Sequence, residues 1–216
     1  MSHEAYVHVR DLQVEFRRDG QTINAVNGVS FDVRKGEVMA LIGESGSGKS
    51  VTLRALMRLH PPKSSVLSGT ITVGDDAVLN MNSQQLRHFR GKTCAMIFQE
   101  PLLAFDPVYT VGQQIIEGLR RHEGLSRSDA KARALEALRQ VRIPSPERRL
   151  DAYPHEMSGG MRQRAMIALA LSCNPRLLLA DEPTTALDAT VQIQILILLR
   201  EQQKLRDLSI IFVTHD

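Results

Sequence analysis

Hydrophobic and polar residues alternate in two segments near the start of the chain, residues 12–16 and 29–33. A two-residue period is typical of a strand that buries one face and exposes the other. Gly20 lies in the polar stretch between the two segments. We therefore predict two half-exposed strands that pair in an antiparallel manner.

Three later segments, residues 38–42, 177–180 and 210–213, are apolar without interruption. Strands have this appearance when helices cover both faces of a parallel sheet, so the pattern indicates an α/β core. The first segment leads into a glycine-rich loop and then into residues 50–59, whose apolar positions have helical spacing.

Between residues 101 and 172 most apolar positions have helical spacing. Ser126 has the form of a helix N-cap, with an acidic residue three positions later, and a further helix is expected to begin near Ser158. This pattern predicts a helical lobe inserted into the α/β core. We expect a single domain with a core of residues 1–100 and 174–216 and a lobe of residues 101–173.

Composition narrows the class of protein. The 216 residues are 43% hydrophobic and carry a net charge of +3, which is too mild to indicate nucleic-acid binding by itself. The longest apolar run, residues 165–171, is far shorter than the ~18–20 residues of a membrane span, and the charged start of the chain does not resemble a secretory leader. Cys94 and Cys173 have no metal-ligand spacing and are expected to be core residues in a reducing cytoplasm.

Residues 43–50 read Gly-Glu-Ser-Gly-Ser-Gly-Lys-Ser and fit the pattern GxxxxGK[ST] between a predicted strand and a predicted helix. Glycines let backbone N–H groups turn toward phosphate oxygens, and the N-terminus of the following helix adds its positive dipole. Lys49 offers a cation to the β- and γ-phosphates, and Ser50 offers a hydroxyl to Mg²⁺. We expect a nucleoside triphosphate to bind through Gly43, Glu44, Ser45, Gly46, Ser47, Gly48, Lys49, Ser50 and Val51.

The apolar segment at residues 177–180 ends in two carboxylates, Asp181 and Glu182. In a P-loop fold such a strand lies beside the loop, so we expect Asp181 to reach Mg²⁺ directly or through a water. Glu182 then lies near the γ-phosphate, where it is placed to polarise the attacking water as a general base.

A second candidate anion site is formed by Ser158, Gly159 and Gly160 at the start of a predicted helix. It offers a hydroxyl, exposed backbone N–H groups and a helix dipole. Because one P-loop already cradles the phosphates, this second site suggests a nucleotide bound by another subunit. The expected assembly is a dimer with ATP between its subunits.

Six motifs in order, GESGSGKS, FQEP, MSGGMRQR, LLLADEP, TTALD and VTHD, cover essentially the whole chain. Together they resemble the ATP-binding subunit of an ABC transporter. More narrowly, the residues of the first and third motifs resemble those of the oligopeptide/dipeptide/nickel/glutathione importer group. The resemblance implies a P-loop NTPase core with a mostly parallel sheet, an N-terminal antiparallel β region and an inserted helical lobe.

The resemblance also implies roles for four further residues. Gln99 matches the glutamine between the lobes that senses Mg²⁺ and the attacking water, and His215 matches the histidine that contacts the γ-phosphate. Asp188 matches an aspartate at the dimer interface. Phe16 lies where the family places an aromatic residue on adenine, although packing within a strand is nearly as good an explanation.

As a family member, the chain is expected to be an ATP hydrolase that energises import of a peptide-like, nickel or glutathione-type solute. ATP and Mg²⁺ are the implied cofactors. The implied partners are a second ATPase subunit, identical or paralogous, membrane permease subunits and, indirectly, an extracytoplasmic solute-binding protein, with no nucleic acid. The implied location is the cytoplasmic face of the bacterial inner membrane, as a peripheral subunit.

The alternative is a soluble ABC-type ATPase that acts on ribosomes or DNA. ABC-type ATPases that act on DNA carry a coiled-coil arm between the residues that match Gln99 and Ser158. The segment between these two residues is too short here for such an arm. Ribosomal regulators generally join two cassettes in one chain. Two departures from the broad ABC pattern are Met157 and Met161 in the third motif. Because family members continue past the position of Asp216, we expect the domain to be C-terminally truncated.

Overall fold

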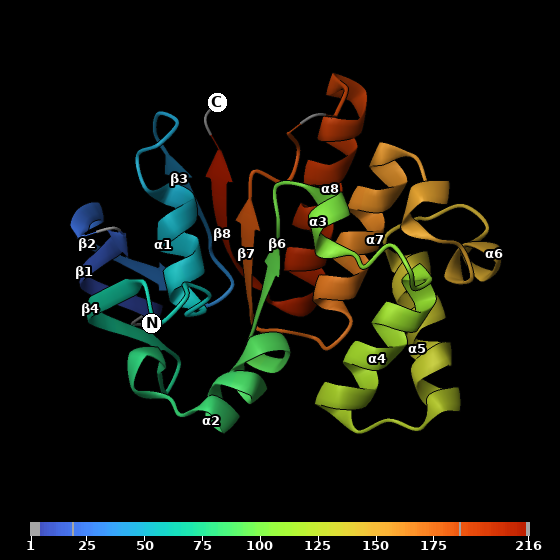
Figure 1. Cartoon of the computed structure of the whole chain (residues 1–216). Coiled ribbons are helices and arrows are strands. Elements are labelled where there is room, and N and C mark those ends of the chain that lie inside the picture. Colours follow the sequence, from blue (N-terminus) through green and yellow to red (C-terminus); the bar gives the residue numbers. More distant parts are fainter. Residues whose placement is uncertain (1–4, 19, 186, 215–216) are drawn as a thin grey trace.

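The computed structural model describes residues 5–18, 20–185 and 187–214, and it contains two four-stranded sheets (Figure 1). The first sheet is antiparallel, with strand order β2-β1-β4-β5. Its strands are β1 (Ala5–Arg18), β2 (Gln21–Arg34), β4 (Ser65–Val73) and β5 (Asp76–Ala77). The predicted antiparallel pair is therefore confirmed as β1 and β2.

The second sheet is parallel, with strand order β3-β8-β7-β6. Its strands are β3 (Val38–Ile42), β6 (Cys94–Ile97), β7 (Leu177–Asp181) and β8 (Ser209–Thr214). All three continuously apolar segments lie in this sheet, which confirms the predicted α/β core.

Helices and short turns connect the strands. The helices are α1 (Lys49–Leu56), α2 (Ser83–His88), α3 (Pro101–Ala104), α4 (Val111–Glu123), α5 (Arg127–Gln140), α6 (Pro146–Leu150), α7 (Gly159–Leu171) and α8 (Ala189–Arg206). Three short turns are η1 (Val78–Asn80), η2 (Phe89–Thr93) and η3 (Pro154–Glu156). Ser126 and Ser158 cap α5 and α7 through their side chains, as their positions in the sequence predict.

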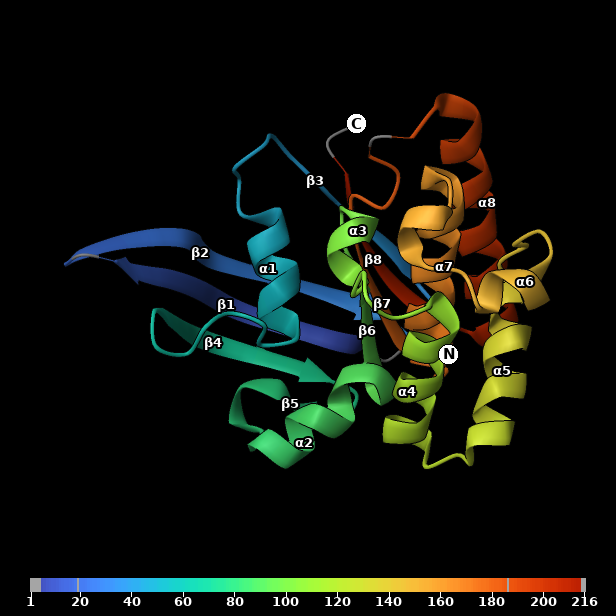
Figure 2. The same cartoon turned by 45° about the vertical axis from the view of Figure 1, so that its right-hand side comes forward.

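The parallel sheet separates two hydrophobic cores, because successive side chains of a strand point to opposite faces. In β6, Cys94 and Met96 pack in the core shared with α1 and the antiparallel sheet, whereas Ala95 and Ile97 pack in the core shared with α4, α5, α7 and α8. Both views show α1 on one side of β6, β7 and β8, and α7 and α8 on the other (Figures 1 and 2).

Strand β3 differs from the expectation that helices cover both of its faces. Val38 is 52% exposed and Ile42 is 70% exposed. The face of β3 that carries Met39 and Leu41 packs against the core shared with α1, whereas the opposite face is open. In the described part of the chain β3 is also an edge strand of the parallel sheet. Continuous apolar sequence therefore marks a central strand at β7 and β8 but an edge strand at β3.

Cys94 and Cys173 are buried as free thiols, as predicted. Among the residues that the structure describes, no helix is both long enough and apolar enough to span a membrane.

Candidate nucleotide-binding site

The glycine-rich loop connects β3 to α1 and folds back against β2. Gly46 and Gly48 have φ angles of +80° and +88°, a region that favours glycine. A Cβ atom on Gly48 would lie 2.5 Å from the carbonyl oxygen of Ala25 in β2. Glycine at position 48 thus allows the loop to approach β2 closely and to begin α1 directly afterwards.

Lys49 is the first residue of α1, and its side chain folds back onto the loop. Its Nζ atom donates hydrogen bonds to the carbonyl oxygens of Gly43 at 2.5 Å and Glu44 at 2.7 Å. A cavity of about 380 Å³ adjoins the loop. The cavity is lined by Ile23, Asn24, Ala25, Ser45, Gly46, Ser47, Gly48, Lys49, Ser50, Val51, Gln99 and Glu182. The loop, its cation and the predicted general base therefore share one cavity.

Asp181 ends β7 directly below the loop and is fully buried. Its Oδ1 atom accepts a hydrogen bond of 2.6 Å from the Ser50 hydroxyl. Its Oδ2 atom is buried without a hydrogen-bond partner in the described part of the chain, and the nearest cation, Arg54 Nη2, is 3.9 Å away. A buried carboxylate oxygen without a donor is costly unless a ligand satisfies it. Together with the Ser50 hydroxyl it forms an oxygen donor set that suits Mg²⁺.

Glu182 follows Asp181 at the carboxyl end of the same strand. Its Oε2 atom accepts hydrogen bonds from Gln99 Nε2 at 3.1 Å and from the Thr185 hydroxyl at 2.9 Å. Gln99 comes two residues after β6, which is the parallel neighbour of β7. Adjacent parallel strands end at the same edge of a sheet, and this places the two side chains together.

Thr185 is a residue of this site that the sequence analysis did not assign. It belongs to the TTALD motif, but the motif alone does not show that its hydroxyl bonds a carboxylate three residues earlier. The three-residue spacing between Glu182 and Thr185 is compatible with a turn, and this spacing is the feature of the sequence that indicates the contact. The structure has this turn, because the backbone N–H of Thr185 donates to the Glu182 carbonyl oxygen at 3.2 Å.

The second candidate anion site, residues 158–160, lies apart from the P-loop cavity. Ser158 Oγ accepts a hydrogen bond of 3.3 Å from the Met161 N–H at the start of α7. Asp188 caps α8 in the same way, by accepting from the Val191 N–H at 2.9 Å. A Cβ atom on Gly160 would lie 3.0 Å from Val191 Cγ1, so α7 and α8 begin side by side. Neither Asp188 nor residues 158–160 line the P-loop cavity.

Phe16 packs against His60 rather than lining the cavity. The two ring centroids are 5.2 Å apart in an edge-to-face arrangement, and the His60 ring also bonds the Val51 carbonyl oxygen at 2.9 Å. The adenine-stacking role of Phe16 therefore stays a prediction. His215, the other residue with a predicted nucleotide contact, lies outside the described residues.

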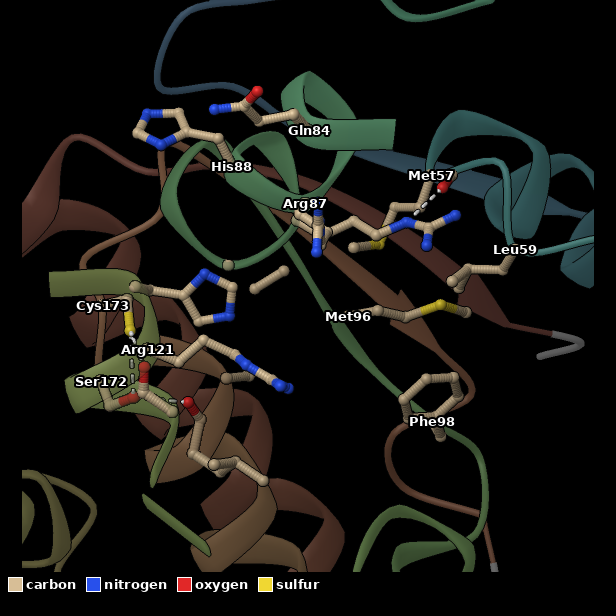
Figure 3. Close-up of a pocket in the computed structure, with 17 residues that line it drawn as sticks. Met57, Leu59, Gln84, Arg87, His88, Met96, Phe98, Arg121, Ser172 and Cys173 are labelled. Carbon is tan, nitrogen blue, oxygen red and sulfur yellow. Dashed lines mark hydrogen bonds between the residues drawn. The ribbon is translucent and has the colours of Figure 1, made fainter. Parts of the chain in front are cut away.

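A larger hollow of about 750 Å³ lies between α2, η2 and β6 on one side and α4 and α7 on the other (Figure 3). Met96 and Phe98 lie on one side of it, and Arg121 of α4 lies on the other. Its described lining residues include Arg87, Arg90 and Arg121 and no aspartate or glutamate. Burial, assisted by the charge of Arg121, lowers the pKa of a further lining residue, His122. The hollow is therefore apolar with a positive charge supplied by arginines.

Comparisons with known proteins agree with this geometry. The chain is 49% identical over 210–211 residues to several peptide importers' ATP-binding proteins, among them the oligopeptide transport ATP-binding protein OppD of Bacillus subtilis (strain 168), with 97% of this chain and 59% of OppD covered. It is 48% identical to the glutathione import ATP-binding protein GsiA of Escherichia coli (strain K12), with 96% of this chain and 34% of GsiA covered. The chain thus spans less than two thirds of these relatives.

A solved structure, the dimeric post-hydrolysis state of the ATP-binding cassette MJ0796 bound to ADP and Pi, superposes with a TM-score of 0.85 at 28% identity. The match covers 97% of this chain and 88% of that one. The sequence model described as "ABC transporter" matches residues 26–185. The P-loop, the two carboxylates at the end of β7 and these matches together show that this chain belongs to the ABC transporter family.

Proposed function

We propose that this chain is the ATP-hydrolysing subunit of an importer for a peptide-like, nickel or glutathione-type solute. The observation that carries the proposal is one edge of the parallel sheet, where the P-loop with Ser50 and the Gln99–Glu182 pair line one cavity. The buried Asp181 carboxylate bonds Ser50 at this edge. The import relatives at 48–49% identity support transport over the ribosomal or DNA-directed alternative.

In this proposal the P-loop binds the phosphates of ATP. Lys49 now bonds two carbonyl oxygens of its own loop, and the γ-phosphate would compete for this cation as a stronger, charged acceptor. Ser50, Asp181 and Gln99 would hold Mg²⁺, which neutralises charge on the β- and γ-phosphates. The buried Asp181 carboxylate is placed to do so because its Oδ2 atom lacks a donor in the described structure.

Glu182 would act as the general base. The hydrogen bonds from Gln99 and Thr185 hold its Oε2 atom, and Glu182 lines the cavity. A carboxylate held in this way can orient a water for attack in line with the γ-phosphate and take its proton as the new bond forms. His215 remains the proposed second contact to the γ-phosphate.

The complete site would need a second subunit. The residues at the start of α7, Ser158 to Gly160, lie on the opposite face of the sheet from α1 and do not line the P-loop cavity of their own chain. They are therefore proposed to contact the nucleotide of the partner subunit, with Asp188 at the interface. The dimeric MJ0796 cassettes support this assembly.

We further propose a peripheral location at the cytoplasmic face of the bacterial inner membrane, with permease subunits as partners and a solute-binding protein as an indirect one. We also propose that residues 1–100 and 174–216 form the core and residues 101–173 the lobe.

The hollow between the core and the lobe is the proposed permease site, and its arginines favour a permease segment that carries carboxylates. Arg121→Glu should weaken co-purification with the cognate permeases, whereas Arg148→Glu, an exposed site outside the hollow, should not.

ATP hydrolysis per mole of chain, measured as protein concentration rises, tests the proposal. A rate that climbs with concentration and is lost in Glu182→Gln supports composite sites shared by two subunits. A rate that stays flat and does not respond to Glu182→Gln contradicts the assignment of both the dimer and the general base.

A further inference from the structure

Gln163 is a buried polar residue of α7 that none of the roles above uses. Its side chain is 2% exposed. Its Nε2 atom donates a hydrogen bond of 2.5 Å to the carbonyl oxygen of Pro183, the residue after Glu182. A glutamine amide is seldom buried unless its hydrogen bonds serve the structure around it, since desolvation is costly.

The segment that receives this bond is strained. Glu182 has a φ angle of +46°, which side chains other than glycine rarely adopt. It also precedes a proline, which restricts its backbone further. Such a conformation persists only where the surrounding contacts fix it, and it is often found at functional sites.

Besides the bonds to the Glu182 side chain, hydrogen bonds to the backbone hold this segment in place. The Glu182 N–H donates to the Val213 carbonyl oxygen at 3.2 Å, and the Thr185 N–H donates to the Glu182 carbonyl oxygen at 3.2 Å. These two bonds come from β8 and from the turn itself. The bond from Gln163 comes from another element, α7. Pro183 has no N–H of its own, so its carbonyl oxygen is the backbone group through which it can be held.

We propose that Gln163 is a positioning residue that holds the Pro183–Thr184 peptide, and with it the adjoining general base Glu182, of its own chain. Without the amide, the Pro183 carbonyl oxygen loses its buried donor. The Pro183–Thr184 peptide can then turn, and the strained residue before it can carry the Glu182 carboxylate away from Gln99 and Thr185. The inference rests on the proposed role of Glu182. It differs from the role proposed for residues 158–160 at the start of the same helix, which serve the partner's nucleotide.

The first test is steady-state ATP hydrolysis by Gln163→Met, a change that keeps the length and removes the donor. We expect kcat to fall by about 10- to 100-fold, the scale of a misplaced catalytic group, with KM for ATP close to wild type. The melting temperature should fall by a few degrees only, because one buried acceptor loses its donor. The matched control is Gln203→Met, because Gln203 also donates to a backbone carbonyl, that of Gly36 at 2.6 Å, but at the other end of the sheet. An unchanged kcat, or the same loss in the control, overturns the proposal.

A second variant, Gln163→Glu, tests the proposal through the pH dependence of kcat, which a purely structural role would not change. The introduced carboxyl can donate to Pro183 only when protonated, and burial favours protonation. Its kcat relative to wild type should therefore rise as the pH is lowered. A ratio that is flat or falls over the same range contradicts the proposal.

A third measurement separates an effect on the general base Glu182 of the same chain from an effect on the nucleotide bound by the partner subunit. In a Glu182→Gln background, ATP-dependent dimer formation by light scattering should survive the addition of Gln163→Met. Loss of the dimer would mean that Gln163 acts through the interface and would overturn the proposal. If Glu182→Gln alone forms no dimer with ATP, the proposed dimer fails, while the two kinetic tests still decide the role of Gln163.

Discussion

Replacing Gly48 by alanine tests whether the P-loop depends on its close approach to β2. Position 48 has a φ angle of +88°, and an added Cβ would lie 2.5 Å from the Ala25 carbonyl oxygen. The left-handed backbone costs about 1–2 kcal/mol for a residue with a Cβ. Forcing an extra methyl group against a fixed neighbour costs about 1–3 kcal/mol more. The total loss of unfolding free energy for Gly48→Ala is therefore about 2–5 kcal/mol.

Gly46→Ala is the matched control for this change. Gly46 has a φ angle of +80°, close to that of Gly48, but nothing lies within 4 Å of its added Cβ. It should lose only the backbone part, about 1–2 kcal/mol. The difference between the two variants then isolates the contact with β2.

Thermal unfolding by differential scanning fluorimetry, without nucleotide, measures this difference. For a chain of this size each kcal/mol moves the melting temperature by about 2–4 °C. Gly48→Ala should therefore melt roughly 2–12 °C below Gly46→Ala. Equal melting temperatures would refute the reasoning, because they would show that the loop moves away from β2 without cost.

Three further predictions concern single side chains. Asp181→Asn keeps the shape and an acceptor for Ser50 but weakens the cation site, so the Mg²⁺ concentration for half-maximal hydrolysis should rise by about 10- to 100-fold in a Mg²⁺ titration. Burial lowers the pKa of His60 below its ordinary 6.5, so the unfolded state binds more protons and the stability present above pH 6.5 is lost as the pH falls below it. His60→Leu should reduce this acid-induced drop in melting temperature, and an unchanged drop would assign it to other groups. Burial raises the pKa of both cysteine thiols, so a thiol reagent should label Cys173, which lines the large hollow, before Cys94, and both only slowly until the chain is unfolded.

The local elements and the chemistry of the loop could be predicted from the sequence by itself. The two-residue period of residues 12–16 and 29–33 indicates paired strands, and Ser126 and Ser158 mark helix starts, because periodicity and capping depend on near neighbours in the chain. The GxxxxGK[ST] pattern likewise specifies a phosphate loop, since its glycines and lysine act within eight consecutive residues.

Only the tertiary structure decided how distant segments meet. The strand order places β3 at an edge, although its sequence is as apolar as that of the central strands. The same order brings Gln99 to Glu182, and helix packing brings the Gln163 amide to Pro183. Helix packing also keeps residues 158–160, at the start of α7, away from the P-loop cavity of their own chain. A sequence pattern reports which face of an element is buried, but the partner that buries it depends on the packing of the whole chain.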